Sequence, residues 1–223
     1  MQVCANAWND GGLEWMEGLT HSTLSQHTGY TRRCLDLLVM NAGIQGWSLD
    51  SMPLEEAVDT LVGDGIEAPL ARHVITMFAS TAAGGADGAV ALDARAVCAE
   101  KACALLEERA VWRLTDFQAA WSKACPPEMP PHLDMLRGLA LVEPQGADHT
   151  VTAFLAVDLP PKPKERFARL FARKERWSRA ELEPYLAHVE EAKASVEGLL
   201  LAWCRRSQGS AGEAEVFTQR HAG

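Results

Sequence analysis

Apolar side chains recur along the chain with the repeat of an α-helix, in three blocks that share one internal pattern. Within each block the apolar positions are three, four or eight residues apart, which places them on one helical face. These positions are Leu35 and Leu38, then Val97 and Leu105, then Phe167, Leu170 and Phe171. The pattern predicts helices over residues 31–41, 94–108 and 163–174.

A tryptophan follows each predicted helix at a constant interval. Trp47, Trp112 and Trp177 are spaced 65 residues apart, and a polar residue comes directly after each one. Self-similarity at a fixed period indicates repeated structural units. We therefore interpret the chain as three consecutive units of one kind.

A second helix is predicted after each tryptophan, because a helix start signal stands there. In a capping box, a hydroxyl and a side chain three residues later bond reciprocally to backbone amides that the helix leaves unpaired. Residues 115–118 (Thr-x-x-Gln) and 178–181 (Ser-x-x-Glu) have this pattern, and Ser51 gives a looser start in the first unit.

A third helix and a final strand complete each predicted unit. Apolar stripes at helical spacing predict the third helices. Their members are Leu70, Val74, Met77 and Phe78; Leu133, Leu136 and residues 139–141; and Val196, Leu199, Leu200, Trp203 and Cys204. Turn-rich stretches at 82–87, 143–148 and 207–212 then precede strands predicted over 89–92, 151–157 and 215–218.

The order helix, short strand, helix, helix, wing strand is that of a winged helix, a helix-turn-helix with an added β-wing. The expected fold is mainly α with short β-wings, an α+β class, built as three tandem winged-helix domains. The domains are predicted at residues 31–93, 94–160 and 161–223, with residues 1–30 unassigned. The alternative is a single irregular helical domain in which the three tryptophans are incidental.

Charge is distributed unevenly along the chain. The formal net charge of −9 argues against a protein that coats nucleic acid with its whole surface. Residues 1–158 hold 9 Lys and Arg against 21 Asp and Glu, whereas residues 159–223 hold 12 against 9. A basic last part attached to an acidic remainder indicates that the two parts face different partners.

The residues give no signal for catalysis, metal binding or membrane insertion. The glycine-rich loop at 84–88 lacks the Gly-Lys-Ser/Thr of a phosphate-binding loop, and no G-x-S-x-G nucleophile elbow occurs. The six cysteines form no C-x-x-C pair, so we predict structural free thiols and expect neither a metal nor another cofactor. The chain lacks a long apolar run and begins without a secretory signal, so we expect an intracellular protein that does not enter a membrane.

Several blocks in the last 110 residues, in order and with matching spacing, carry a resemblance to a known family. They are residues 112–121 (WRLTDFQAAW), 126–129 (PPEM), 136–142 (LRGLALV), 158–160 (DLP), 165–171 (ERFARLF), 177–185 (WSRAELEPY), 199–200 (LL) and 216–220 (VFTQR). Together they resemble the carboxy-terminal half of the "defective in sister chromatid cohesion" subunit of the alternative replication factor C clamp loader. The resemblance reaches the first unit more weakly from about residue 31, and the family's β-rich amino-terminal half has no counterpart among these blocks.

The resemblance implies a non-enzymatic accessory role in the nucleus. Such proteins dock the clamp loader onto DNA polymerase epsilon and contact DNA, while other subunits hydrolyse ATP and the loader places or removes the sliding clamp. The implied partners are the large and small partner subunits of the alternative clamp loader, the polymerase, and double-stranded or primed DNA bound without sequence preference. Two other hypotheses stay open: a winged-helix transcriptional regulator, and a structural adaptor with no DNA contact.

Basic residues on the first helix of the third unit are the candidate DNA contacts. Arg166, Arg169 and Arg173 lie at i, i+3 and i+7 and form one stripe, which Lys174 extends. Arginine suits this role because its planar guanidinium matches a phosphate with two hydrogen bonds. The opposing interpretation is that nearby glutamates, including Glu165, Glu175 and Glu181, neutralise the stripe.

The end of the third unit holds the candidate polymerase contacts. The resemblance assigns this role to Arg205 and Arg206, predicted at the end of the third helix, and to Phe217 and Arg220 on the predicted final strand. From the residues alone, Arg205 and Arg206 could instead only offset the dipole at a helix C-terminus. The third helix begins with acidic residues, which favours a protein contact over reading of the DNA major groove.

Overall fold

A computed structural model of the protein describes residues 21–80, 88–146, 148–186, 189, 195–207 and 215–220, with the backbone alone for residues 21–28. The chain divides into two compact units. The first comprises Met1–Leu136 with Val142–Val151, and the second comprises Arg137–Leu141 with Thr152–Gly223. Most of the unassigned segment 1–30, the predicted turn at 82–87 and residues 208–212 of the predicted turn at 207–212 lie outside the described residues.

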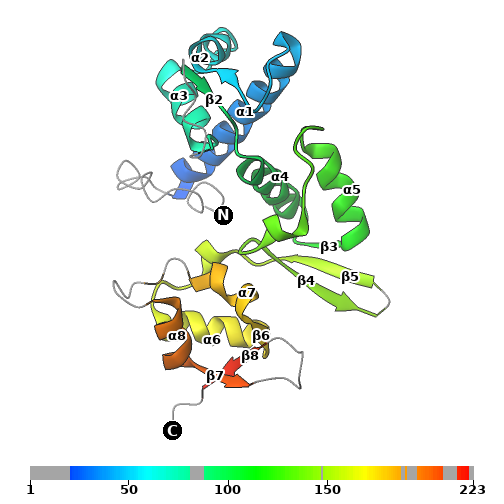
Figure 1. Ribbon diagram of the computed structural model, residues 1–223, viewed down its shortest axis with the longest axis vertical. Coiled ribbons are helices and arrows are strands. Elements are labelled where there is room, and N and C mark those ends of the chain that lie inside the picture. The colour runs from blue at the N-terminus through cyan, green and yellow to red at the C-terminus, as the bar shows by residue number, and fades with distance from the viewer. Residues whose placement is uncertain are drawn as a thin grey trace. The chain divides into compact units, whose positions relative to one another are not determined.

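Helix α1 opens the described part of the first unit (Figure 1). It spans His21–Gln45, longer than the predicted 31–41, and it buries Leu35 and Leu38 as their spacing predicts. The elements that follow are β1 (Met52–Pro53), α2 (Leu54–Gly63), α3 (Ala68–Met77) and β2 (Ala89–Val90). Strands β1 and β2 pair antiparallel, and α2 and α3 pack against each other and against α1.

A second group of elements continues the first unit. Helix α4 has the predicted bounds, Ala94–Glu108, and is followed by β3 (Val111–Arg113), α5 (Leu114–Ala124), the 3-10 helix η3 (Leu133–Leu136), β4 (Ala140–Gln145) and β5 (Asp148–Ala153). The three strands form one sheet in the order β3-β5-β4. Trp121 on α5 is buried, and its Nε1 donates a hydrogen bond of 2.7 Å to the carbonyl of Cys98 on α4.

The second unit holds the last group of elements. They are the 3-10 helix η4 (Ala156–Asp158), α6 (Pro163–Arg173), β6 (Trp177–Ser178), α7 (Arg179–Leu182), the 3-10 helix η5 (Glu183–Leu186), α8 (Val196–Trp203), β7 (Cys204–Ser207) and β8 (Val216–Gln219). Strand β8 is central in the sheet order β6-β8-β7. Helix α6 begins with a proline, whose fixed φ suits the first helical turn.

The same order of elements therefore recurs at the predicted interval. A helix, a short strand, two or three further helical elements and a return strand follow one another; the short strand contains or adjoins the tryptophan in the last two groups but begins five residues after Trp47 in the first, and in the last two groups the third strand pairs between the first and the second. The mixture of helices with small antiparallel sheets confirms the α+β class. The division into three domains stays a prediction, because the contacts group the first two predicted domains into one unit.

Ion pairs connect α1 of the first group to α4 of the second. Arg32 donates from Nε to Glu100 and from Nη1 to Glu107, both at 2.9 Å, and Lys101 pairs with Asp36. Burial raises the pKa of Glu100 to about 6, although the Arg32 charge opposes the shift. Burial also lowers the pKa of Arg32, but its two carboxylate partners outweigh that effect and raise it.

The structure corrects three helix predictions. The third helical element of the middle group is a four-residue 3-10 helix, and residues 140–141 belong to β4. Helix α8 ends at Trp203, so Cys204 starts a strand and is not a helical core residue. Helices α2 and α5 begin at Leu54 and Leu114 without a side-chain cap, so the predicted start signals at Ser51 and Thr115 do not act as caps.

The cysteine prediction holds at four positions. Cys34, Cys98, Cys125 and Cys204 are buried free thiols. Burial raises the pKa of Cys34 to about 11 and that of Cys204 to about 12, which suits structural rather than reactive thiols. Cys103 is disulfide-bonded, so the prediction of a free thiol is wrong there. Cys4 lies outside the described residues.

Candidate partner-binding surface

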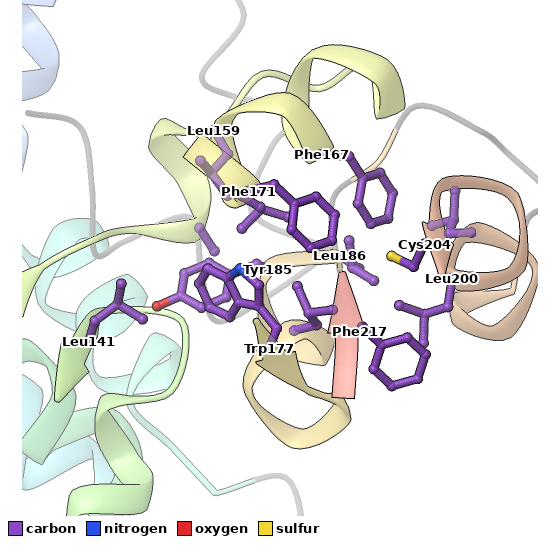
Figure 2. Close-up of a cluster of buried hydrophobic side chains, with 14 residues drawn as sticks. Leu141, Leu159, Phe167, Phe171, Trp177, Tyr185, Leu186, Leu200, Cys204 and Phe217 are labelled. Carbon is purple, nitrogen blue, oxygen red and sulfur yellow. The ribbon is translucent and has the colours of Figure 1, made fainter. Parts of the chain in front are cut away.

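The core of the second unit fixes the positions of the strands that carry the candidate residues (Figure 2). Trp177 on β6 is fully buried and packs edge-to-face on Tyr185, with ring centroids 5.6 Å apart. The Trp177 Nε1 donates to the Lys174 carbonyl at 2.6 Å, and the Tyr185 hydroxyl donates to the Phe154 carbonyl at 3.1 Å. Each buried ring thus satisfies its polar atom, as a stable aromatic core requires.

Phe217 belongs to this core, so its predicted role as a polymerase contact is wrong. Its side chain is 4% exposed and lies beside Leu200 and Cys204 (Figure 2). On β8 it pairs across the sheet with Trp177 of β6 and with Arg206 of β7. Because a buried phenylalanine cannot reach a partner, Phe217 supports the surface from beneath and does not form part of it.

Arg205 and Arg206 lie on strand β7, not at the end of a helix as predicted. Both are exposed, and they pair across the sheet with Thr218 and Phe217. Arg206 forms an ion pair with Glu215, which directly precedes β8. The interpretation that these two arginines only offset a helix dipole therefore does not apply, because the helix has already ended.

Arg220, rather than Arg205 and Arg206, lies at the C-terminus of α8. It follows β8, and its Nη1 donates a hydrogen bond of 3.0 Å to the carbonyl of Leu201 in the last turn of α8. A cation there interacts favourably with the partial negative charge of the helix C-terminus. Arg220 is still exposed, so its guanidinium joins Arg205 and Arg206 on the surface at the β7–β8 end of the unit.

Arg166 is buried, so its predicted role as a DNA contact is wrong. It is 1% exposed and donates to four backbone carbonyls: Pro160 at 2.7 Å, Tyr185 at 2.6 Å, Leu159 at 3.1 Å and Ala156 at 3.2 Å. Burial lowers the pKa of this guanidinium. Its hydrogen bonds join α6 to the η4 segment and to the end of η5.

The sequence contained a signal for the burial of Arg166. Arg166 lies four residues before Leu170, which is one helical turn, and next to Phe167. Both of those residues are buried, so the period of the apolar face places Arg166 at the edge of that face. The stripe of Arg166, Arg169 and Arg173 was predicted from charge alone, and it runs from the buried face of α6 to its exposed face.

The other three candidate DNA contacts differ in their surroundings. Arg169 is exposed on α6, and Arg173 is half-buried in the last turn of the same helix. Lys174 forms an ion pair of 2.6 Å with Glu181 and lies over the Trp177 ring, 5.4 Å from its centroid. The prediction that a glutamate neutralises part of the stripe therefore applies to Lys174.

The capping box predicted at the start of α7 is confirmed. The Ser178 hydroxyl accepts from the Glu181 backbone amide at 3.3 Å, and Glu181 accepts from the Ser178 amide at 2.8 Å. Burial raises the pKa of Glu181, but hydrogen bonds from Lys174 and Ser178 outweigh that effect and lower it. Glu181 thus connects the end of α6 with the start of α7.

One exposed apolar side chain near this surface was not singled out from the sequence. Leu201 on α8 is 64% exposed, although it lies directly after the buried pair Leu199 and Leu200. The helical period indicates this exposure, because Leu201 lies between the buried Leu200 and Trp203, which packs against the core. The carbonyl of Leu201 is the acceptor for Arg220, so the leucine borders the basic group.

Within the described ranges, no cluster of three or more His, Cys, Asp or Glu side chains has the arrangement of a metal site. None of the described helices combines the length and apolar character that a membrane crossing requires.

Comparison with known proteins gives a consistent result across the chain. The model of the family described as "Sister chromatid cohesion protein Dcc1" matches residues 22–186. A sister chromatid cohesion protein of Xenopus laevis is 28% identical over 178 residues, covering 80% of this chain and 45% of the relative. The mouse protein of that name is also 28% identical over 178 residues, covering 80% of this chain and 44% of the relative.

Two relatives from outside the vertebrates are described by the same name. A probable sister chromatid cohesion protein of Dictyostelium discoideum is 26% identical over 216 residues, covering 85% of this chain and 56% of the relative. The Saccharomyces cerevisiae protein is 28% identical over 109 residues, covering 48% of this chain and 27% of the relative. The chain thus spans about half the length of the vertebrate relatives that it matches.

Proposed function

The chain belongs to the family of the sister chromatid cohesion protein Dcc1, and from this premise we propose that it is a non-catalytic accessory protein in sister chromatid cohesion. It acts in the nucleus as part of an alternative replication factor C clamp loader, with a large and a small partner subunit. Its own task is to dock that loader onto DNA polymerase epsilon and DNA, so that the sliding clamp is loaded or removed at the right place.

The observation that carries the docking proposal is the exposed arginine pair on β7. Arg205 points to one face of β7, whereas Arg206 lies on the other face together with the buried Cys204 and Phe217, which hold the strand in place. A rigid support lowers the entropy lost on binding, because the strand is already in place. Arg220 adds a third guanidinium beside the end of α8. Together Arg205, Arg206 and Arg220 form the docking surface.

We assign the DNA contact to the exposed face of α6, away from the buried Arg166. Arg169 is the exposed member of the original stripe, and a single arginine of this kind contacts phosphate without reading sequence. Lys174 contributes less, because its ammonium is already paired with Glu181. The DNA contact is therefore auxiliary to the protein contact.

The recurring order of elements supports the winged-helix interpretation. In a winged helix the strand after the first helix and the two wing strands form one small sheet, with the last strand in the centre. The orders β3-β5-β4 and β6-β8-β7 both have this arrangement. The first group has the same order of helices, with one pair of strands among its described residues.

The alternative of a sequence-specific transcriptional regulator is less well supported. In such a protein the third helix enters the major groove and presents polar or basic side chains to the base edges. Helix α8 instead exposes Glu197, which is paired with Arg179, and the apolar Leu201. An acidic and apolar surface suits contact with a protein better than contact with a polyanion.

A pull-down with the catalytic region of DNA polymerase epsilon tests the proposed function. We expect the wild-type chain to retain the polymerase, and a variant with Arg205→Ala, Arg206→Ala and Arg220→Ala to lose most of it. The matched control is Arg72→Ala, which removes an exposed ion-paired arginine from α3 in the first unit. Retention of the polymerase by a folded triple variant would refute the assignment of the docking surface.

A further inference from the structure

Strand β7 is an edge strand with a defined set of outward-facing backbone groups. In the sheet order β6-β8-β7, it pairs with β8 on one side, and no strand within the described residues pairs with its other side. An edge strand of this kind presents N–H and C=O groups that can bond to another chain.

The register between β7 and β8 shows which backbone groups of β7 face outward. The Arg220 amide donates to the Trp203 carbonyl at 3.1 Å, and this pair continues the register in which Cys204 faces Gln219 and Arg205 faces Thr218. In an antiparallel ladder, hydrogen-bonded and non-hydrogen-bonded pairs alternate. Arg205 and Ser207 therefore bond to β8, whereas the backbone groups of Cys204 and Arg206 point to the open edge.

Two further contacts agree with this assignment. The Thr218 hydroxyl lies 3.4 Å from the Arg205 carbonyl, as expected if that carbonyl faces β8. The Cys204 amide is occupied, because it donates to Leu200 at the end of α8. The outward groups are thus the carbonyl of Cys204 and both the amide and the carbonyl of Arg206.

The side chains on this edge select the chemistry of the partner. Arg205 and Arg206 are adjacent and exposed, so a second copy of β7 would bring like charges together and is disfavoured. A strand with carboxylates opposite these arginines is favoured instead. Arg206 already pairs with Glu215 of the same chain, so a carboxylate of the partner takes the place of Glu215 at this position.

From this edge and its charge we propose that β7 binds its partner by strand addition: an extended acidic segment pairs with the open edge as a fourth strand, and carboxylates on its two faces contact Arg205 on one face of the sheet and Arg206 on the other. This inference rests on the proposed function for the identity of the partner, the polymerase, but not for the mode of binding. The edge is short and offers three backbone groups, so the arginines provide much of the affinity and the backbone fixes the direction and register of the segment.

The first test uses synthetic peptides and the full chain. The probe is an acetylated, amidated octapeptide in which pairs of adjacent glutamates alternate with pairs of threonines, so that carboxylates lie on both faces of the added strand, and the control has lysine in place of glutamate. We expect the acidic peptide to bind and to slow hydrogen exchange at the Arg206 amide, while the exchange at the Arg205 amide, already bonded to β8, changes little. Absence of binding by the acidic peptide, or binding that leaves the Arg206 amide unprotected, would overturn strand addition.

The second test uses the polymerase catalytic region and separates strand addition from docking. Arg206→Pro removes an outward amide without removing a bond to β8, whereas Arg206→Ala removes only the side chain. We expect Arg206→Pro to weaken the complex at least tenfold more than Arg206→Ala. Equal effects of the two variants would overturn strand addition and leave the proposed docking intact, whereas failure of the wild-type chain to bind the polymerase would overturn the proposed docking alone.

The fold of the proline variant has its own control. The NMR resonance of the Trp177 indole Nε1–H, which donates to the Lys174 carbonyl from the far strand of the sheet, reports whether the sheet is intact. If Arg206→Pro changes that signal, exchange at the Arg206 amide in the wild-type complex with the polymerase decides the question. Slower exchange in the complex supports strand addition, and unchanged exchange contradicts it.

Discussion

The guanidinium of Arg166 donates to the backbone carbonyl of Tyr185 at 2.6 Å, 19 residues further along the chain. The same guanidinium reaches three other carbonyls around the η4 segment. An arginine that appeared from its charge to be a surface residue is therefore part of the framework that holds α6 in place. Arg169, the exposed arginine on α6, depends on this framework for its position.

Replacing Arg166 should destabilise the second unit strongly. Arg166→Ala leaves buried carbonyls without donors, and each unsatisfied group costs about 1–3 kcal/mol. We expect the free energy of unfolding to fall by about 3 kcal/mol or more. Chemical denaturation followed by tryptophan fluorescence measures this loss. The matched control is Arg169→Ala on the same helix, which should change stability by less than about 0.5 kcal/mol.

The capping box of α7 should contribute measurably to stability. Ser178→Ala removes the acceptor of the Glu181 amide, and loss of such a cap costs about 1 kcal/mol. Thr115→Ala is the comparison, because Thr115 matches the same pattern in sequence but does not cap α5. Similar losses of unfolding free energy in the two variants would contradict the assignment of the caps.

Glu100 should make the stability of the first unit depend on pH. Burial raises its pKa from the ordinary 4.5 to about 6, so the folded state binds the proton more tightly than the unfolded state. The associated stability is fully present below about pH 4.5 and is lost as the pH rises through about 6. Glu100→Gln cannot ionise, so its unfolding free energy relative to wild type should rise over this interval by up to about 2 kcal/mol.

The control for that experiment is Glu107→Gln, whose carboxylate also pairs with Arg32 but is more exposed. A difference between Glu100→Gln and wild type that stays constant from pH 4 to pH 8 would show that Glu100 does not titrate in this way.

Arg169 should contribute to DNA binding without contributing to sequence preference. Arg169→Ala removes one exposed guanidinium, so it should weaken binding to unrelated duplexes by a similar factor and reduce the slope of log affinity against log salt by about 1. Fluorescence anisotropy over a range of salt concentrations measures both quantities. Loss of affinity for one duplex sequence only would instead favour the transcriptional-regulator hypothesis.

The sequence predicted the fold well where periodicity and backbone chemistry act locally. The bounds of α4, the capping box at Ser178 and the buried positions Leu35, Leu38 and Phe167 all follow from spacing along one helix. The 65-residue tryptophan interval also marked the first strand of the second and third groups, at Trp112 and Trp177, but not of the first group, where β1 begins at Met52. These features need no knowledge of distant residues.

The site was predicted less well because burial depends on contacts that sequence spacing does not contain. Arg166 and Phe217 have opposite character, yet both are buried, since their partners at Tyr185 and Trp177 come from other elements. The boundary between α8 and β7 was missed because Cys204 continues the apolar stripe of the helix while its backbone already pairs with Gln219. In both cases the tertiary partner decides the outcome.

The most direct test of the central claim, that the docking surface of the second unit binds the polymerase, is the dissociation constant of the full chain for the catalytic region of DNA polymerase epsilon. We predict that the pair Arg205→Glu and Arg206→Glu weakens binding at least tenfold, while Arg205→Lys and Arg206→Lys weakens it much less and Arg72→Glu on the first unit has no effect. A dissociation constant unchanged by the double glutamate variant, in a protein that still folds, would contradict the account.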